Sequence, residues 1–93
     1  MRRIEPTNAF KRDYKRVKAT PKHRDVELLL SEVLTSLAAD SPLLERYRDH
    51  PLTGDWKDHR DCHIKPDRVL IYRKPDGELL QLVRLGSHSE LGL

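Results

Sequence analysis

Residues 60–86, RDCHIKPDRVLIYRKPDGELLQLVRLG, show the two-residue period of a β-sheet. At the start of this stretch, Cys62 and Ile64 point to one face while Asp61 and His63 point to the other. Because the first pair is apolar, we expect Cys62 and Ile64 to face the core of the protein. Cys62 would then be a small packing residue rather than a nucleophile.

Two further strands complete the pattern. Residues 68–73 are mostly β-branched and aromatic, and residues 78–85 read as a strand that returns after a turn with Gly77 at its tight position. Gly86 breaks this last strand. We therefore expect residues 87–93 to form only a short tail.

A first amphipathic helix precedes the strands. Thr7 or Asn8 can cap it, and Phe10, Tyr14 and Val17 recur at helical spacing to form its apolar stripe. This pattern predicts one apolar face for the helix.

A second helix is expected to begin after Thr20, its N-cap, with Pro21 as its first residue. It would end at the sequence DSPLL, residues 40–44. Its apolar residues recur at Val26, Leu29, Leu30, Val33 and Leu37.

These elements predict a single α+β domain over residues 1–93. Its N-terminal helical hairpin would pack on one face of a small, largely antiparallel β-sheet. Residues 1–5 could add a strand or form a frayed end. The other face of the sheet would be free of helices, and Asp61 and His63 would lie on it.

The composition excludes several classes of protein. The chain has 18 Lys and Arg against 15 Asp and Glu, a formal net charge of +3, and no apolar run near the length that spans a bilayer. No apolar signal segment follows the basic start, and one cysteine cannot form an internal disulfide. We expect a cytoplasmic protein with no membrane partner.

A basic run, KRDYKRVK, lies at residues 11–18 of the first helix. Its helix face would suit contacts with RNA phosphates, and an ordinary solvated face explains the charge equally well. The five basic residues are Lys11, Arg12, Lys15, Arg16 and Lys18.

Four candidate catalytic residues can share the helix-free face or its rim: His50, His63, Asp67 and His88. Histidine titrates near neutral pH, so a pair of histidines can divide general base and general acid duties. The set suits RNA transesterification, in which the ribose 2′-OH attacks its own phosphodiester without a metal. Arg84 is the candidate cation for the phosphate.

Simpler structural readings exist for several residues. His59 and His63 have H-x3-H spacing, but no further ligand pair accompanies them, so we expect no metal. Trp56 could stack on a base or pack in the core. His23 and His59 are expected to be inert surface histidines.

The second half of the chain carries an ordered series of short motifs. They are DHPL (49–52), G-x-W (54–56), RD-x-H (60–63), PD (66–67), LIY (70–72) and GSH (86–88). In this order and spacing, and with the helical first half, the chain resembles the YafQ branch of the RelE-type bacterial toxins over essentially its whole length.

The resemblance implies a RelE-like fold and a type II toxin. Such toxins are ribosome-dependent endoribonucleases that cleave mRNA in the A site by metal-independent 2′-OH attack and so inhibit translation. It also implies a cognate antitoxin that neutralises the toxin, a free toxin that is a monomer, and a larger complex that binds operator DNA through the antitoxin. No cofactor is expected.

The resemblance also implies roles for the candidate residues. His50 would be the general base and His88 the general acid, while His63 and Asp67 orient the phosphate and ribose. Asp61, in the RD-x-H motif, would support them. The chain lacks the aromatic residue that members of this branch can carry after the last histidine, which leaves its codon preference open.

Two rival functions differ in class. A non-catalytic module would bind RNA, the ribosome or an antitoxin with the same fold but without cleavage. A metal-dependent nuclease would need a stoichiometric ion.

Overall fold

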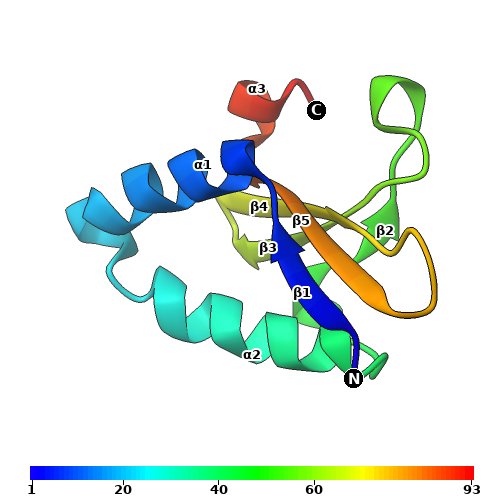
Figure 1. Cartoon of the computed structure of the whole chain (residues 1–93). Helices are drawn as coiled ribbons and strands as arrows, with labels where there is room; N and C mark the ends of the chain where they lie inside the picture. The colour runs from blue at the N-terminus through cyan, green and yellow to red at the C-terminus, as the bar shows by residue number, and fades with distance from the viewer.

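The computed structural model describes residues 1–93, and a mixed sheet of five strands lies at its centre (Figure 1). The elements are β1 (Arg3–Pro6), α1 (Asn8–Ala19), α2 (Val26–Ala38), β2 (His50–Pro51), β3 (Arg60–Lys65), β4 (Arg68–Arg73), β5 (Leu79–Gly86) and α3 (His88–Leu91). The strand order is β1-β5-β4-β3-β2, with β1 parallel to β5 and the other neighbours antiparallel. The predicted α+β class and largely antiparallel sheet are confirmed.

The strands β3, β4 and β5 form the meander that the two-residue period predicts. Cys62 lies opposite Leu70, and Leu70 lies opposite Leu85. These three side chains are fully buried in the main core, together with Ile64 at 4% exposure. The prediction that Cys62 and Ile64 face the core is therefore confirmed, and burial raises the pKa of the Cys62 thiol.

The helices α1 and α2 supply the other half of this core. They diverge from the segment that joins them, so that α2 covers one face of the sheet and α1 packs along β5 (Figure 1). Their buried apolar side chains are Phe10, Val17, Val26, Leu30, Val33, Leu37 and Ala38. No helix in the structure has the length and apolar character needed to cross a membrane.

The first residues of α1 and α2 can be compared with the caps that the sequence predicts. Thr7 is the cap of α1, and its hydroxyl accepts a hydrogen bond from the Phe10 N–H at 3.0 Å. The expectation that Thr20 caps the second helix is wrong. The Thr20 hydroxyl donates instead to the Arg16 carbonyl at 3.1 Å, and Pro21 lies in a separate short turn, so that α2 begins only at Val26.

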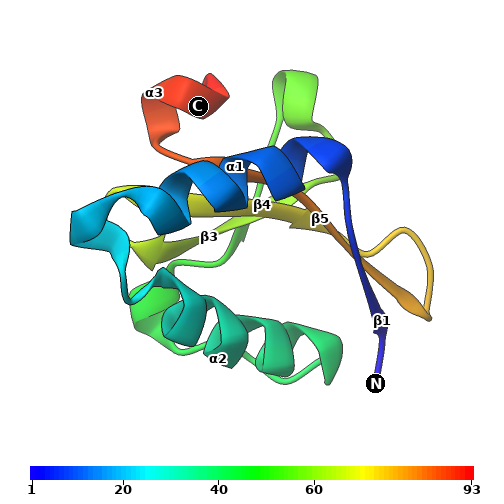
Figure 2. The ribbon, with the colours of Figure 1, turned by 60° about the vertical axis from the view of Figure 1, so that its left-hand side comes forward.

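A third helix, α3, occupies the face of the sheet that was expected to be free. Figure 2 shows α3 on the side of the strands opposite α2. Ser87 and Glu90 form a reciprocal capping box, and Leu91 is buried against Val69 and Ile71. The expected tail is therefore a helix that packs on the sheet.

A buried carboxylate joins α1 to β5. Asp13 accepts hydrogen bonds from Arg84 at 2.6 and 3.2 Å and from the Leu85 N–H at 3.0 Å. Burial alone would raise the pKa of Asp13, but the hydrogen bonds from Arg84 and Leu85 and the charges of Arg84 and Arg16 outweigh it. The pKa of Asp13 therefore lies below its ordinary value of 3.8.

The Asp13 carboxylate should make a large contribution to stability. We expect Asp13→Asn to lower the free energy of unfolding by about 2 to 4 kcal/mol, because Arg84 loses its counter-charge in a buried setting. Chemical denaturation would measure this loss. Asp55→Asn, at an exposed position, is the matched control.

The same substitution should change the dependence of stability on pH. A carboxyl group whose pKa is lower in the folded than in the unfolded state stabilises the fold at pH values above its unfolded pKa. This stabilisation is lost as the pH falls through the folded pKa. In the wild type, Asp13 therefore adds to the loss of stability below about pH 4, and Asp13→Asn should reduce it. An unchanged acid dependence would contradict the role given to this carboxylate.

Candidate active site

Three of the candidate residues converge at the β2 edge of the sheet. His50 in β2 lies opposite Asp61 in β3, and His63 is two residues further along β3 on the same face. The His50 Nε2 is 2.8 Å from the Asp61 Oδ1, and potential ligand atoms of His50, Asp61 and His63 all lie within 4.8 Å of one another. The strand pairing thus brings together residues that are 13 apart in the sequence.

The fourth member of this cluster, His88, comes from the first turn of α3. Its imidazole centroid is 4.9 Å from that of His63, with the rings tilted by 57°. Trp56 fixes the end of the helix, because its indole Nε1 donates to the Leu91 carbonyl at 3.1 Å. Trp56 also packs against the apolar side chains of Val69, Ile71 and Leu91. This contact favours the packing role over base stacking.

The carboxylate at the centre of the cluster is almost completely enclosed. Asp61 is 1% exposed, and burial raises its pKa, while the charges of His50, His63 and His88 oppose the rise. The His50 Nε2 lies 2.8 Å from the Asp61 Oδ1, although this oxygen has no hydrogen bond of good geometry.

The environment of His63 has the opposite effect. Burial lowers the pKa of His63, and the charge of His88 lowers it further. His63 is therefore mainly neutral at pH 7, with a ring nitrogen that can accept a proton or a hydrogen bond.

Asp67 does not join the cluster. Its carboxylate lies 3.4 Å from Lys22 Nζ and 3.8 Å from His23 Nε2, beside the segment between α1 and α2. In the structure Asp67 pairs with Lys22 and His23, whereas Asp61 lies in the cluster. The role of Asp67 in holding the phosphate or ribose stays a prediction.

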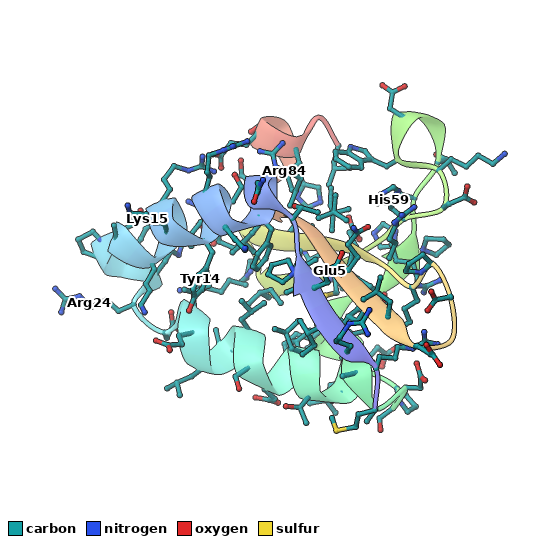
Figure 3. The ribbon with its side chains drawn as sticks, in the orientation of Figure 1. Glu5, Tyr14, Lys15, Arg24, His59 and Arg84 are labelled. Carbon is teal, nitrogen blue, oxygen red and sulfur yellow. The ribbon has the colours of Figure 1, made fainter.

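Arg84 is also committed elsewhere. Figure 3 shows it beside the start of α1, and both of its hydrogen bonds go to Asp13. A contact with a phosphate would require Arg84 to give up this buried partner. Its role at the phosphate stays a prediction. No local pattern in the sequence indicates a pairing between residues that are 71 positions apart.

The two histidines expected to be inert lie outside the cluster. His59 is in the loop before β3, where it contacts the Trp56 ring and the Lys57 carbonyl, and it does not belong to the converging ligand group (Figure 3). His59 and His63, which have H-x3-H spacing, therefore lie in different surroundings. His23 is buried at 1% exposure rather than on the surface, because it packs beneath the turn that carries Asp67.

The basic residues of α1 are all exposed. Arg16 pairs with Asp13 and with Glu90 of α3, and Lys18 pairs with Glu27. The other three, Lys11, Arg12 and Lys15, form no ion pair in the structure. The contact from Arg16 to Glu90 joins this basic face to the helix that carries His88.

Comparisons with known proteins agree on one family. The family described as "Bacterial toxin of type II toxin-antitoxin system, YafQ" matches residues 2–92. The mRNA interferase toxin YafQ of Escherichia coli strain K12 is 38% identical over 90 residues, which cover 97% of this chain and 95% of that protein.

Solved structures give the same result. The metal-bound toxin from Helicobacter pylori is 45% identical, with a TM-score of 0.84, and covers 98% of this chain and 99% of its own. YafQ in the E. coli DinJ–YafQ complex is 37% identical, with a TM-score of 0.82 and 98% of each chain covered. The imidazoles and carboxylate of His50, Asp61 and His63 are ligand types that divalent transition metals accept.

The titrations of the neighbouring His63 and His88 rings should be coupled in solution. We expect the pKa of His63 to lie below its ordinary value of 6.5. His88→Ala should raise it, because the variant removes a neighbouring positive charge and admits water. An NMR titration of the His63 imidazole protons would measure this pKa in the wild type and in the variant. Ser89→Ala, on the same helix, is the control, and a pKa of His63 that is equal in the two variants would contradict this geometry.

Proposed function

Since the chain belongs to the YafQ family of bacterial toxins of type II toxin–antitoxin systems, we propose that it is an mRNA interferase that cleaves mRNA in the ribosomal A site. The observation that carries the proposal is the convergence of His50, His63 and His88, from three different elements, around the buried Asp61. A buried carboxylate without an aligned hydrogen bond destabilises a fold, which favours a functional reason for its position.

The proposed chemistry needs two proton transfers. His50 takes the proton of the ribose 2′-OH, and the oxygen attacks the adjacent phosphorus. The bond to the 5′ oxygen then breaks, and His88 donates a proton to that oxygen. The products are a 2′,3′-cyclic phosphate and a 5′-OH, and the reaction consumes no water and needs no metal ion.

The surroundings of each imidazole suit these duties. The Asp61 carboxylate stabilises the imidazolium that forms on His50 after proton uptake. His88 is exposed on the first turn of α3, where a leaving nucleotide has room. Neutral His63 lies between the two ends of the reaction and would hold the phosphate or the ribose in position.

The basic face of α1 supports binding to ribosomal RNA. Lys11, Arg12 and Lys15 are exposed and carry no acidic partner, so their charge is available to phosphates. Arg16 and Lys18 lie on the same helix and would join them once RNA replaces Glu90 and Glu27. Positioning by the ribosome would explain how so few catalytic groups suffice.

The partner of the free toxin would be a cognate antitoxin. An open groove of about 510 Å³ lies between β1, α1 and α2, and most of its lining is apolar. Ile4, which lines the groove, is 42% exposed. A segment of the antitoxin with an apolar face would cover this groove, and the larger complex would bind operator DNA through the antitoxin.

The rival function is a non-catalytic binding module with the same fold. It would arrest translation by occupying the ribosome and would not need the histidines. The two functions separate in one experiment, because binding alone leaves the mRNA intact.

Cleavage should depend on the three clustered histidines. We expect His50→Ala and His88→Ala each to slow cleavage on programmed ribosomes by about 10²- to 10⁴-fold, the usual contribution of a general acid or base. His63→Ala should also slow cleavage, because the substrate loses a positioning contact. End mapping of a labelled mRNA would locate the cut and identify a 2′,3′-cyclic phosphate and a 5′-OH. His88→Ala should keep the thermal stability of the wild type, because the side chain of His88 is exposed.

His59→Ala is the matched control for these variants, since His59 lies outside the cluster. Equal cleavage by His50→Ala and His59→Ala would contradict the mechanism. An uncut mRNA with every codon tested would favour the binding module. Cleavage that leaves a 3′-OH would mean a different reaction.

The groove should contribute to antitoxin affinity. We expect Ile4→Glu to weaken binding of the cognate antitoxin by at least about tenfold, because the complex would bury an unpaired charge. Isothermal titration calorimetry would measure the affinity. Leu28→Glu changes another exposed apolar residue outside the groove, and an equal effect of both variants would contradict this position for the antitoxin.

A further inference from the structure

The phosphate cleaved in the proposed reaction needs a cation, and the structure holds Arg84 away from that task. A negative charge develops on the phosphate as the 2′ oxygen attacks, and arginine stabilises such charge with charge-assisted hydrogen bonds. Arg84 donates both of its side-chain hydrogen bonds to Asp13. A basic residue that lies beside the histidines without a partner could make this contact at a lower cost.

Arg48 is the basic residue that the fold leaves free at this position. A hollow of about 640 Å³ has His63, Arg46, Arg48 and Lys65 in its lining. Lys65 is 2.8 Å from the Asp25 carboxylate, and Arg46 pairs with Glu32 and donates to the Tyr47 hydroxyl. Arg48 is exposed and its guanidinium has no ion pair or hydrogen bond in the structure.

Arg48 is close to His63 because it lies just before β2, which pairs with the strand that carries His63. His50 lies opposite Asp61 in the antiparallel pair of β2 and β3. Arg48 lies two residues before His50, and both Arg48 and His63 line the hollow described above. The charge of Arg48 is among those that lower the pKa of His63, in agreement with this position.

The backbone that carries Arg48 is anchored on both sides. Tyr47 is buried at 4% exposure, and the Asp49 carboxylate accepts hydrogen bonds from Tyr72 at 2.5 Å and from Arg60 at 3.3 Å. Arg48 itself is in the left-handed region, with φ of 49°, a conformation that is unfavourable for a residue with a Cβ. The flanking contacts hold this conformation, and it directs a free arginine toward solvent at the edge of the cluster.

We propose that Arg48 binds a non-bridging oxygen of the phosphate that is cleaved, and that it supplies the positive charge to the transition state. This inference rests on the proposed function. It assigns the phosphate to the space between Arg48, His63 and His88. His50 would then reach the 2′-OH from the β2 side of the phosphate, and His88 would reach the 5′ oxygen from the α3 side.

Single-turnover cleavage on programmed ribosomes tests the proposal. We expect Arg48→Ala to lower the rate constant by about 10- to 100-fold, and Arg48→Lys to restore part of it, because lysine keeps the charge but not the forked geometry. Arg3→Ala is the matched control, since Arg3 is an exposed arginine in the strand at the opposite edge of the sheet. It should cleave at the rate of the wild type.

Phosphorothioate substrates test the contact itself. In one of the two phosphorothioate stereoisomers, sulfur replaces the oxygen that Arg48 binds, and the wild type should cleave this stereoisomer more slowly than the other. Arg48→Ala should cleave the two stereoisomers at the same rate. A general loss of structure would lower both rates and leave their ratio unchanged. Retention of the full stereoisomer difference in Arg48→Ala would overturn the proposal.

The remaining outcomes distinguish a failure of the role of Arg48 from a failure of the proposed function. If the wild type cleaves and Arg48→Ala matches Arg3→Ala, the role of Arg48 is wrong and the proposed function stands. If the wild type cleaves no codon, the proposed function fails and the role of Arg48 fails with it. An NMR titration of His63, independent of cleavage, should show a higher pKa in Arg48→Ala than in Arg3→Ala.

Discussion

The alternation of side chains along β3 is the constraint that links the core to the candidate site. Cys62 and Ile64 fill the core beneath the helices, and for that reason Asp61 and His63 must lie on the other face. A shift of one residue in the pairing would bury both polar groups against α2 and expose the apolar pair. The same hydrophobic burial that stabilises the sheet therefore fixes the histidine and the aspartate of the site.

The remaining members of the site depend on this strand through local contacts. β2 is only two residues long, and its pairing with β3 brings His50 to Asp61. α3 is held by its capping box, by the burial of Leu91 and by the hydrogen bond from Trp56. Each connection is short, so the histidines come from three elements but are fixed to a single sheet.

Much of this arrangement could be predicted from the sequence, and the failures have physical causes. The period of residues 60–86 predicts the meander and its buried face, because it is local. The capping signal of Ser87 and Glu90 was also present, but a helix of one turn has no apolar period to support it. The destinations of Asp67 and Arg84 depend on a turn direction and on a partner in α1, and no local pattern encodes either. The family resemblance indicated the histidines, whereas only the structure shows that Asp61 lies at their centre.

The reactivity of Cys62 can report on the opening of the native structure. The thiol is fully buried in the central part of the sheet, and burial raises its pKa, so reagents that require an exposed thiolate cannot attack it in the native state. Labelling can proceed only through openings that separate β3 from its neighbours or the helices. Because the chain has a single cysteine, the rate of labelling would follow the opening of this one region without any engineered probe.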